Sequence, residues 1–534
     1  MADRNQDTRA ALAFHAATKY AALRDPAGQV QYVMGTPPAH EDPIWQEDWS
    51  IEPLAYKVYP TLEPIALPVD LQRSTLPALD ALARTGGEAD SAPPMPDRAS
   101  VARLARLSNG LLNRAVTSRS GRIVQFRTAG GTGARYHLEL YFVCGDLPDL
   151  EAGVYHYAAD EHSLRQLRAG DLRGTVVEAS GHEPALARAP LVLLMTSTFW
   201  RNAWRYKARA YRHTYWDTGT SLANFLAVAA SLNLPTQVVL GYSEAALNGL
   251  LGVDGEREAV VAVCAVGRGD PAPNAPADLP RINFATQPLS HAEVTFAEIP
   301  RMHAASALGS GEQAALWRRP PLQRTLAAPR QAPIPLTPLA DARIPSAPIE
   351  DVILARRSTR HYDTQRPISF DLFSTVLDRS VRGFAADCLA AGAPPLHDGY
   401  LIVNAVEGIA PGVYRHRAQE GSIEPLRAGD FRAQAAHLAF DQQYAADAHV
   451  NSYYLTDLGP VLERHGNRGY RLAQLEAALY AGRLHLAAHA LGLGAVGSTS
   501  FDDEVVDFFS PSATGASYMF VTVFGSKQAR MRSG

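Results

Sequence analysis

GVYHYAADEHSLRQLRAGDLR, at residues 153–173, returns as GVYRHRAQEGSIEPLRAGDFR at residues 412–432. The same offset of 259 residues relates RAYR (209–212) to RGYR (468–471), and it relates Asp217 to Glu476. A period of this length is the size of a domain, whereas solenoid repeats have periods of about 20–50 residues. The sequence therefore predicts an internal duplication, folded as a covalently fused dimer with pseudo-two-fold symmetry.

The composition is that of an ordinary globular protein with more than one domain. The chain has 534 residues, of which 46% are hydrophobic and 19% charged, and this length exceeds what a single core normally organises. A net charge of -4 gives no electrostatic reason to expect nucleic acid or an anionic membrane as a partner. No apolar run approaches the length of a bilayer span. Residues 1–7, MADRNQD, lack the pattern of a secretory signal, so we expect a cytoplasmic protein.

Three cysteines, Cys144, Cys264 and Cys388, lie far apart and form no C-x-x-C motif. This spacing argues against a zinc site and against a disulfide framework. We expect each cysteine to be a small buried residue.

Strand and helix patterns alternate within each copy. Alternating or continuous apolar runs predict strands, and long Ala- and Leu-rich runs predict a buried central helix. The strands are expected at 137–143, 259–266, 400–406 and 518–524, and the central helices at 219–233 and 472–491. The fold class expected is α+β, with two copies of a central mixed sheet wrapped by helices.

Composition also divides the chain. We predict an N-terminal segment (1–80), a first domain (81–270), a Pro-rich linker or wrap (271–345) and a second domain (346–534). The linker contains PAPNAPADLP (271–280) and APRQAPIPLTP (328–338), and proline disfavours both helix interiors and central strands. In the N-terminal segment, FHAATKYAALRD (14–25) is expected to be helical, and Tyr59–Pro68 extended.

The second copy opens with ILARRSTRHYDTQRPIS (353–369). A helix ending in R-R-S-x-R and followed by an aromatic-Asp pair resembles the start of the nitroreductase family, where this motif binds FMN. Guanidinium forks and a hydroxyl suit a phosphate dianion. The resemblance therefore implies that Arg356, Arg357, Ser358 and Arg360 bind the FMN phosphate and ribityl chain.

The first copy contains FRTAGGTGARYHLELYFV (126–143). This is similar to the RTAPSAGARYPLEIY-type motif of the SagB/ThcOx branch, FMN-dependent dehydrogenases that oxidise azolines in peptide natural products. FHAATKY (14–20), KVYP (57–60) and WRYKARAYRHTYWDTG (204–219) extend the resemblance over nearly the whole chain. It implies cofactor contacts from Arg127, Gly130, Gly131, Thr132 and Gly133, where glycine lets the backbone approach the flavin closely.

The two copies have lost complementary parts. The first copy has LARTGGEADS (82–91) in place of R-R-S-x-R, and the second has AADCLAAGAPP (385–395) in place of the glycine motif. In nitroreductase dimers FMN lies at the interface, with the R-R-S-x-R arm from one subunit and the glycine-rich loop from the other. The resemblance thus implies one complete FMN pocket per chain. It adds Gly497 and Ser498 over the ring, and Lys527 and Arg530 at the phosphate, although the last two can equally be a solvated tail.

The catalytic pair of the azoline-oxidising relatives is Lys-Tyr, and Arg205-Tyr206 stands at the matching position. Arginine stays protonated and cannot act as a base. Tyr206 can still move a proton, with Lys207 next to it, although a packing role for Tyr206 is the alternative. His485 and His489 have the i, i+4 spacing of metal ligands, but no third ligand is evident, so we expect helix packing and no metal.

Three functions compete. The first is an FMN-dependent dehydrogenase or oxidase in natural-product biosynthesis, which oxidises an azoline-like, peptidyl or carrier-bound substrate, passes electrons to oxygen and works beside biosynthetic partners. The second is an NAD(P)H-dependent nitro- or quinone reductase. The third is a non-catalytic scaffold for a cyclodehydratase-like complex. All three are compatible with further homodimerisation of the fused pair.

Overall fold

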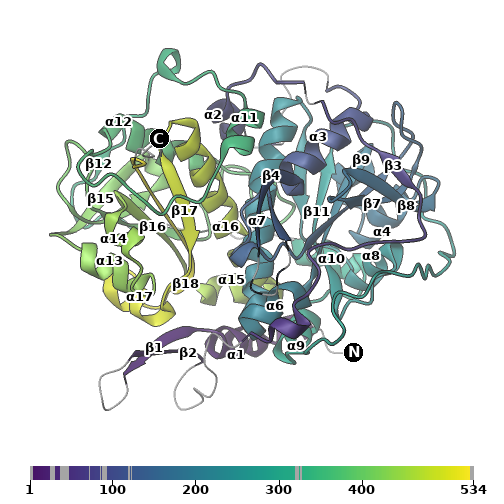
Figure 1. Cartoon of the computed structure of the whole chain (residues 1–534), viewed down its shortest axis with the longest axis horizontal. Helices are drawn as coiled ribbons and strands as arrows, with labels where there is room; N and C mark the ends of the chain where they lie inside the picture. The colour runs from purple at the N-terminus through teal and green to yellow at the C-terminus, as the bar shows by residue number, and fades with distance from the viewer. Residues whose placement is uncertain are drawn as a thin grey trace.

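The computed structural model describes residues 4–24, 30–35, 47–70, 72–84, 86, 93–117, 119, 121, 123–318, 324 and 327–528. Figure 1 shows two bodies of similar architecture side by side, the first copy in blue and teal and the second in green and yellow. Two long helices, α7 (Ala210–Ser231) and α16 (Asn467–Ala490), pack against each other between the two sheets (Figure 1). The predicted fused pair of α+β units is therefore confirmed.

Each copy is built on a seven-stranded sheet, and the two sheets have the same strand order. The repeated stretches that revealed the duplication are equivalent hairpins in the two sheets, β7–β8 and β14–β15. In spatial order, the first sheet consists of β10 (Thr236–Val239), β11 (Glu258–Val266), β9 (Leu191–Thr198), β6 (Leu138–Cys144), β7 (Gly153–Ala158), β8 (Ser163–Ala169) and β3 (Pro64–Ala66). The second consists of β17 (Gly494–Ser498), β18 (Ser517–Gly525), β16 (Val450–Thr456), β13 (Asp398–Val403), β14 (Gly412–Arg417), β15 (Ser422–Ala428) and β12 (Ile334–Pro335).

The sheets differ from expectation in one respect. We expected mixed sheets, but every strand pairing described in the two sheets is antiparallel. The centre of each sheet is a meander joined by short turns, a connection that forces neighbouring strands to run in opposite directions. The four predicted strands are present, and the three cysteines are buried as expected.

Helices α7 and α16 are buried along nearly their whole length, and their charged side chains are paired or hydrogen-bonded inside the molecule. A Cβ atom added to Gly219 of α7 would lie 2.5 Å from the carbonyl oxygen of Leu475 in α16, so the helix backbones approach closely there. The remaining helices of the first copy are α2 (Ala78–Ala83), α3 (Arg98–Asn109), α4 (Arg173–Ala179), α5 (Pro184–Ala187), α6 (Phe199–Tyr206) and α8 (Glu244–Leu251). Those of the second are α11 (Ile349–Ala355), α12 (Phe370–Ser380), α13 (Arg432–Leu438), α14 (Gln443–Asp447), α15 (Leu458–His465) and α17 (Asp502–Phe509).

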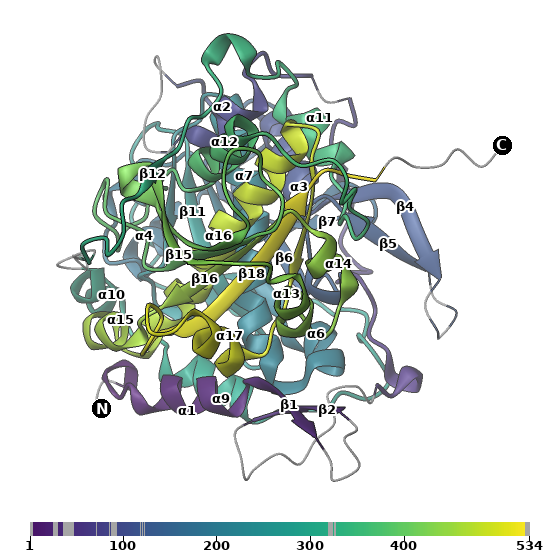
Figure 2. The ribbon, with the colours of Figure 1, turned by 90° about the vertical axis from the view of Figure 1, so that its left-hand side faces the viewer.

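Two hairpins stand out from the body (Figure 2). One is formed by β1 (Tyr20–Arg24) and β2 (Val30–Met34), the other by β4 (Leu111–Thr117) and β5 (Ile123–Arg127). The first corrects the expectation of a helix over 14–25, because α1 spans Arg9–Ala17 and ends before Tyr20. The Tyr20 N–H donates to Asp502 (2.8 Å) and its ring packs on Phe440 with centroids 5.4 Å apart, so tertiary contacts outweigh helix propensity there.

The segment between the copies also contains helices, α9 (Glu298–Ala305) and α10 (Gly311–Arg318), where we expected none. Residues 301–318 are free of proline, and Pro300 occupies the first turn of α9, where its missing N–H costs no hydrogen bond. No helix in the described ranges is long and apolar enough to cross a membrane.

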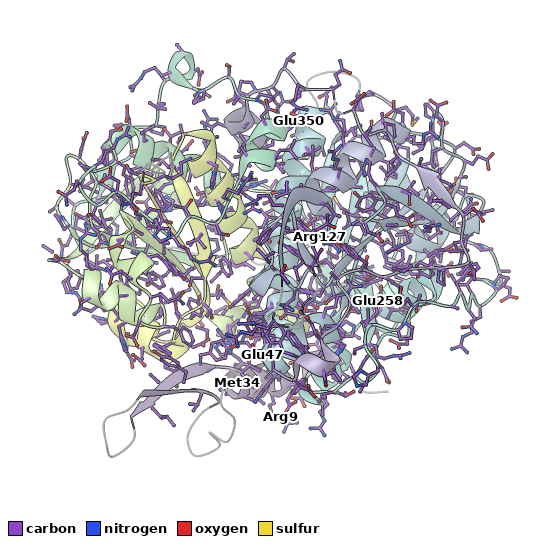
Figure 3. All side chains as sticks on the ribbon, in the orientation of Figure 1. Arg9, Met34, Glu47, Arg127, Glu258 and Glu350 are labelled. Atoms are coloured by element: carbon purple, nitrogen blue, oxygen red, sulfur yellow. The ribbon has the colours of Figure 1, made fainter. Side chains whose placement is uncertain are left out.

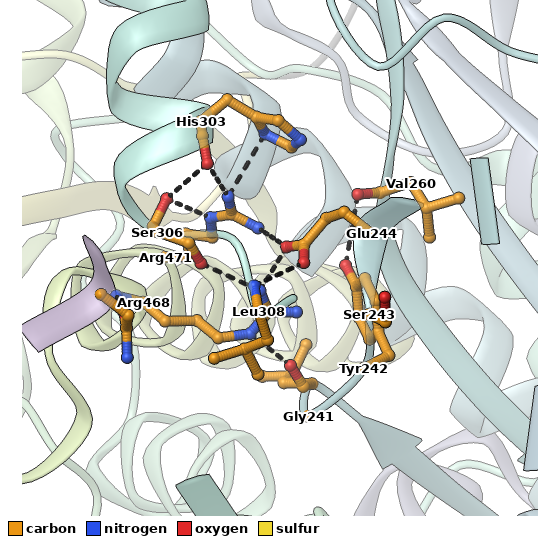
Figure 4. Close-up of polar contacts among 12 residues, drawn as sticks. Gly241, Tyr242, Ser243, Glu244, Val260, His303, Ser306, Leu308, Arg468 and Arg471 are labelled. Carbon is orange, nitrogen blue, oxygen red and sulfur yellow. Dashed lines mark hydrogen bonds and ion pairs between the residues drawn. The ribbon is translucent and has the colours of Figure 1, made fainter. Parts of the chain in front are cut away.

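Ion pairs between the copies come in two matching sets. In one, Arg209 and Arg212 of the first copy pair with Asp502 of the second, at 2.8 and 2.5 Å. In the other, Arg468 and Arg471 of the second copy pair with Glu244 of the first (Figure 4). All of these side chains are nearly inaccessible to solvent. The duplication has thus preserved two reciprocal sets of buried ion pairs across the pseudo-two-fold axis.

Each set is covered by an equivalent helix. The Arg212 guanidinium donates to the His15 carbonyl and the Thr18 hydroxyl at the end of α1. The Arg471 guanidinium donates to the His303 carbonyl and the Ser306 hydroxyl at the end of α9 (Figure 4). Helix α9 therefore takes the place around the second copy that α1 takes around the first. The sequence similarity between the two helices is limited to a short stretch, FHAAT (14–18) and MHAAS (302–306).

Candidate active site

The arm of the second copy (Arg356–Arg360) meets the glycine loop of the first (Gly130–Gly133). The Arg356 guanidinium donates from Nε and Nη2 to the carbonyl of Thr128, both at 3.2 Å. On Gly130, an added Cβ atom would meet only Arg356 Nη1, at 4.0 Å, so the loop is open on that side. The structure therefore brings together the two parts that the copies have kept separately.

Arg356 is buried without a counter-charge. It is 6% exposed, and no carboxylate in the described part of the chain pairs with it. Burial, with Arg114 and Arg357 nearby, lowers the pKa of Arg356 to about 10. A buried guanidinium without an anion costs several kcal/mol in principle, and an anionic ligand relieves that cost. The donor set thus fits a phosphate group.

The rest of the arm runs beside β17. Ser358 forms a β-bridge with Ala495, and the Thr359 N–H donates to the Ala495 carbonyl at 3.0 Å. Lys527 approaches the same point, since a Cβ atom on Gly494 would lie 2.7 Å from Lys527 Cγ. Ser358, Arg360 and Lys527 are exposed, so their polar groups remain available to a ligand. Arg530 lies outside the described residues.

Two histidines hold the arm from behind. His485 and His489 of α16 donate from Nε2 to the Arg357 carbonyl, at 3.1 and 2.8 Å. Burial, together with the nearby charges of Arg356 and Lys527, lowers the pKa of His489 to about 3, and burial lowers the pKa of His485 as well. Both imidazoles therefore stay neutral in a cationic surrounding. Among the described residues, no three His, Cys, Asp or Glu side chains gather as metal ligands.

Asp217 of α7 fixes the glycine loop. Its carboxylate accepts from the Thr132 N–H (2.9 Å), the Thr132 hydroxyl (2.7 Å) and His137 Nε2 (2.9 Å). The Thr220 hydroxyl donates to the Gly130 carbonyl at 3.0 Å. Sequence reasoning did not assign Asp217 this role, although its match to Glu476 carried the signal. Glu476 accepts from the Leu396 N–H at 2.8 Å in the equivalent place.

We expect Asp217→Ala to release the glycine loop, because three donors lose one acceptor, at a local cost of ~1–3 kcal/mol. The Thr132 amide should then exchange its hydrogen roughly 10- to 100-fold faster. Hydrogen exchange resolved to residues 128–136 measures this, with Glu476→Ala as the matched control. Equal protection of residues 128–136 in both variants would contradict the role of Asp217.

Arg127 lies behind the loop. Its guanidinium donates to the carbonyls of Ala55 (2.9 Å) and Asn109 (3.2 Å), and it is buried near the line where the two halves meet (Figure 3). These contacts hold the strand that leads into the loop.

Tyr206, at the end of α6, is the catalytic candidate that contacts the glycine loop. Gly133 has a φ of 60°, and a Cβ atom there would overlap the Tyr206 hydroxyl. Burial raises the pKa of Tyr206, so the phenol is neutral. Arg205 pairs with Glu47 at 3.2 Å, and Glu47 lies below Arg127 in the view of Figure 3. Lys207 has a left-handed φ of 50° and begins the next turn of the chain.

A series of four rings runs from Tyr206 to the second copy. The centroid of Tyr206 lies 4.7 Å from that of His213, His213 lies 4.9 Å from Trp216, and Trp216 lies 5.0 Å from Phe520. A Cβ atom on Gly497 would lie 3.0 Å from Phe520. This ring series, absent from our sequence-based candidates, joins the two loops of the site.

The loop after β17 has unused donors. In the part of the chain that the structure describes, the N–H groups of Thr499 and Ser500 meet no acceptor, and the buried Ser500 hydroxyl has no partner. The Ser498 hydroxyl bonds to the Tyr444 hydroxyl at 2.6 Å. No described hydrogen bond joins this loop to Gly130–Gly133.

Cavities elsewhere do not include this site. One of about 980 Å³ lies beside β11, α8 and residues 281–289, and one of about 30 Å³ lies near His397 and His416. Neither is lined by Arg356 or the glycine loop. The candidate site is therefore defined by the contacts between the arm of the second copy and the glycine loop of the first.

Known proteins share this architecture. A solved structure from Anabaena variabilis, described as a nitroreductase, matches 97% of this chain with 99% of its own, at a TM-score of 0.74 and 24% identity, which establishes a shared fold. A protein of Methanocaldococcus jannaschii, also described as a nitroreductase, is 30% identical over 162 residues, which are 30% of this chain and 81% of that protein. The trifolitoxin-processing protein TfxB of Rhizobium leguminosarum bv. trifolii is 31% identical over 141 residues, which are 26% of this chain and only 38% of TfxB.

The sequence profile of the Nitroreductase family matches residues 132–268 and again residues 353–525. These two matches fall in the two copies and together cover more than half of the chain. The chain therefore belongs to the nitroreductase family and carries two domains of that family in tandem.

Proposed function

We propose that this protein is an FMN-dependent dehydrogenase with one flavin site per chain, formed between the arm of the second copy and the loop of the first. The observation that carries the proposal is Arg356, a buried guanidinium without a carboxylate partner, which lies on the glycine loop of the other copy. Members of the nitroreductase family are generally FMN-dependent oxidoreductases, which supports the choice of cofactor.

The cofactor contacts follow from this arrangement. Arg356, Ser358, Arg360 and Lys527 would bind the phosphate and ribityl oxygens, with Arg357 held by the two histidines through its carbonyl. Gly130–Gly133 and Gly497–Ser498 would flank the ring. Arg127 would support the loop from behind. When bound, FMN supplies the hydride-accepting chemistry.

The proton in such an oxidation needs a group of the protein. Tyr206 is the proposed carrier, because it is neutral and its hydroxyl lies against Gly133. Arg205 stays charged beside Glu47 and orients the end of α6. Lys207 follows Tyr206 directly and is the second candidate for the proton.

We propose a peptide-derived or carrier-bound substrate, such as an azoline, with oxygen as the electron acceptor. The motifs shared with the azoline-oxidising branch support this substrate class, and so does the likeness to a trifolitoxin-processing protein. Such a substrate is normally delivered by other biosynthetic enzymes, so we also propose a partner complex.

The purified protein is expected to be yellow and to release one FMN per 57.7 kDa chain on denaturation. Absorbance of the released flavin against protein concentration measures the ratio. A colourless protein that cannot be reconstituted with FMN would contradict the proposal.

Anaerobic addition of NADH or NADPH separates the proposed dehydrogenase from a nicotinamide-dependent reductase. Under the proposed function the flavin absorbance should persist for many minutes after addition. Bleaching within seconds would replace the dehydrogenase with a nitro- or quinone reductase.

A further inference from the structure

The pseudo-two-fold axis generates a second place where a loop and a strand edge of opposite copies meet. The offset of 259 residues relates it to Phe126–Gly133 of the first copy and Gly497–Ser500 of the second, the two loops of the proposed flavin site. At the symmetry-related place, residues 385–392 of the second copy face Val238–Gly241 of the first. The proposed site has no described hydrogen bond between its two loops, whereas the related place is closed by several.

The closure begins with backbone pairing. The Val238 N–H donates to the Ala385 carbonyl at 2.9 Å, and the Asp387 N–H donates to the Val238 carbonyl at 3.1 Å. Ala386 thereby forms a parallel bridge with Val238. Gly497, the counterpart of Val238 in β17, is exposed and has no such bridge among the described residues.

The Asp387 carboxylate completes the closure. It accepts from the N–H groups of Leu240 and Gly241, both at 2.9 Å, just after β10. Thr499 and Ser500 stand just after β17 in the same way, and their N–H groups meet no described acceptor. The side chain of Asp387 is fully buried, and Arg318 is its nearest cation, at 3.9 Å.

Further contacts hold residues 382–388 and the turn that they face in place. The Arg483 guanidinium of α16 donates to the carbonyls of Arg382 and Gly383. Phe384 packs on Tyr480 with ring centroids 6.2 Å apart, and Cys388 is buried. Arg318 donates to the carbonyls of Ser180, Gly181 and Gly241 around the same turn.

We propose that residues 385–388 are an internal ligand: the Asp387 carboxylate occupies a carboxylate-binding turn formed by Leu240 and Gly241, and it permanently seals the second pocket of the fused pair. Paired backbone N–H groups in a turn bind anions in this way. The inference rests on the proposed function, because the second pocket is defined by symmetry with the proposed flavin site. It explains why the pair would hold one flavin although it has two equivalent interfaces.

Small carboxylates test the seal directly in the full-length protein. Asp387→Ala frees both N–H groups and leaves space for formate, so its melting temperature should fall and should recover by about 1–2 °C in sodium formate relative to sodium chloride. Wild type should show no difference between the two salts. Asp387→Asn fills the space, so it should be destabilised without a formate response.

Each result has a defined reading. An Asp387→Ala variant as stable as wild type, or one that does not respond to formate, overturns the inference. So does a wild-type protein with two FMN per chain. A formate response in a protein that binds no flavin supports the internal ligand while contradicting the proposed function, so the two failures are distinguishable.

Discussion

Arg356→Met is expected to weaken FMN binding by about 100-fold or more, because charge-assisted hydrogen bonds to a phosphate each contribute ~1.5–3 kcal/mol. The variant should be isolated nearly colourless. Flavin-free protein titrated with FMN, followed by flavin fluorescence, gives the dissociation constants.

The same variant should behave oppositely in stability when no flavin is bound. Without FMN, the wild-type guanidinium is buried without an anion, and methionine fills a similar volume without charge. Replacing a buried charge by an apolar group is often neutral or stabilising by ~1–4 kcal/mol. We therefore expect flavin-free Arg356→Met to unfold at an equal or higher urea concentration than flavin-free wild type. A structural salt-bridge residue would show the reverse.

Arg84 provides the matched control. It follows α2 as Arg356 follows α11, and the two helices are related through the bridge between Pro77 and Pro348. Arg84→Met removes the corresponding side chain from the copy that has lost the arm motif. FMN affinity should stay within about twofold of wild type. A comparable loss of affinity in both variants would mean that the flavin does not lie where we propose.

Much of the fold could be predicted because the duplication was visible. The central helices and the buried strands follow from apolar patterning, and the repeat at 153–173 and 412–432 shows that the two copies share one fold. The antiparallel order of the sheets and the helices at 298–318 could not be predicted, because strand pairing and the burial of an Ala-rich segment depend on distant partners. Helix α9 is stabilised by Arg471, which lies far away in the sequence.

The candidate site, too, could be predicted only in part from the sequence. The meeting of Arg356 with the glycine loop could be predicted, since the copies had lost complementary motifs. The anchoring of that loop by Asp217, and of the arm by His485 and His489, could not, because those roles depend on which donors the fold brings near each acceptor. The seal by Asp387 was hidden for the same reason: residues 385–395 were visible only as a lost motif.

The buried ion pairs between the copies lead to the second large expected effect, a loss of stability. Glu244→Ala would leave Arg468 and Arg471 buried with no carboxylate partner, and breaking a buried pair from one side costs ~3–5 kcal/mol. Arg471 would keep its contacts to His303 and Ser306, which do not neutralise its charge. The packing of α16 on α7 should therefore weaken, and the unfolding transition should move to lower urea or split into two steps.

Asp503→Ala is the control for this experiment. Asp503 also follows the equivalent strand, but its side chain is 61% exposed and pairs with Lys19 at the surface. Exposed pairs contribute only ~0–1 kcal/mol, so its urea midpoint should barely move. A double variant, Glu244→Ala with Arg471→Met, should recover part of the loss, because it removes one of the two uncompensated charges. If Glu244→Ala unfolds like Asp503→Ala, the reciprocal ion pairs do not hold the two copies together, and the interface rests on the apolar contact between α7 and α16 alone.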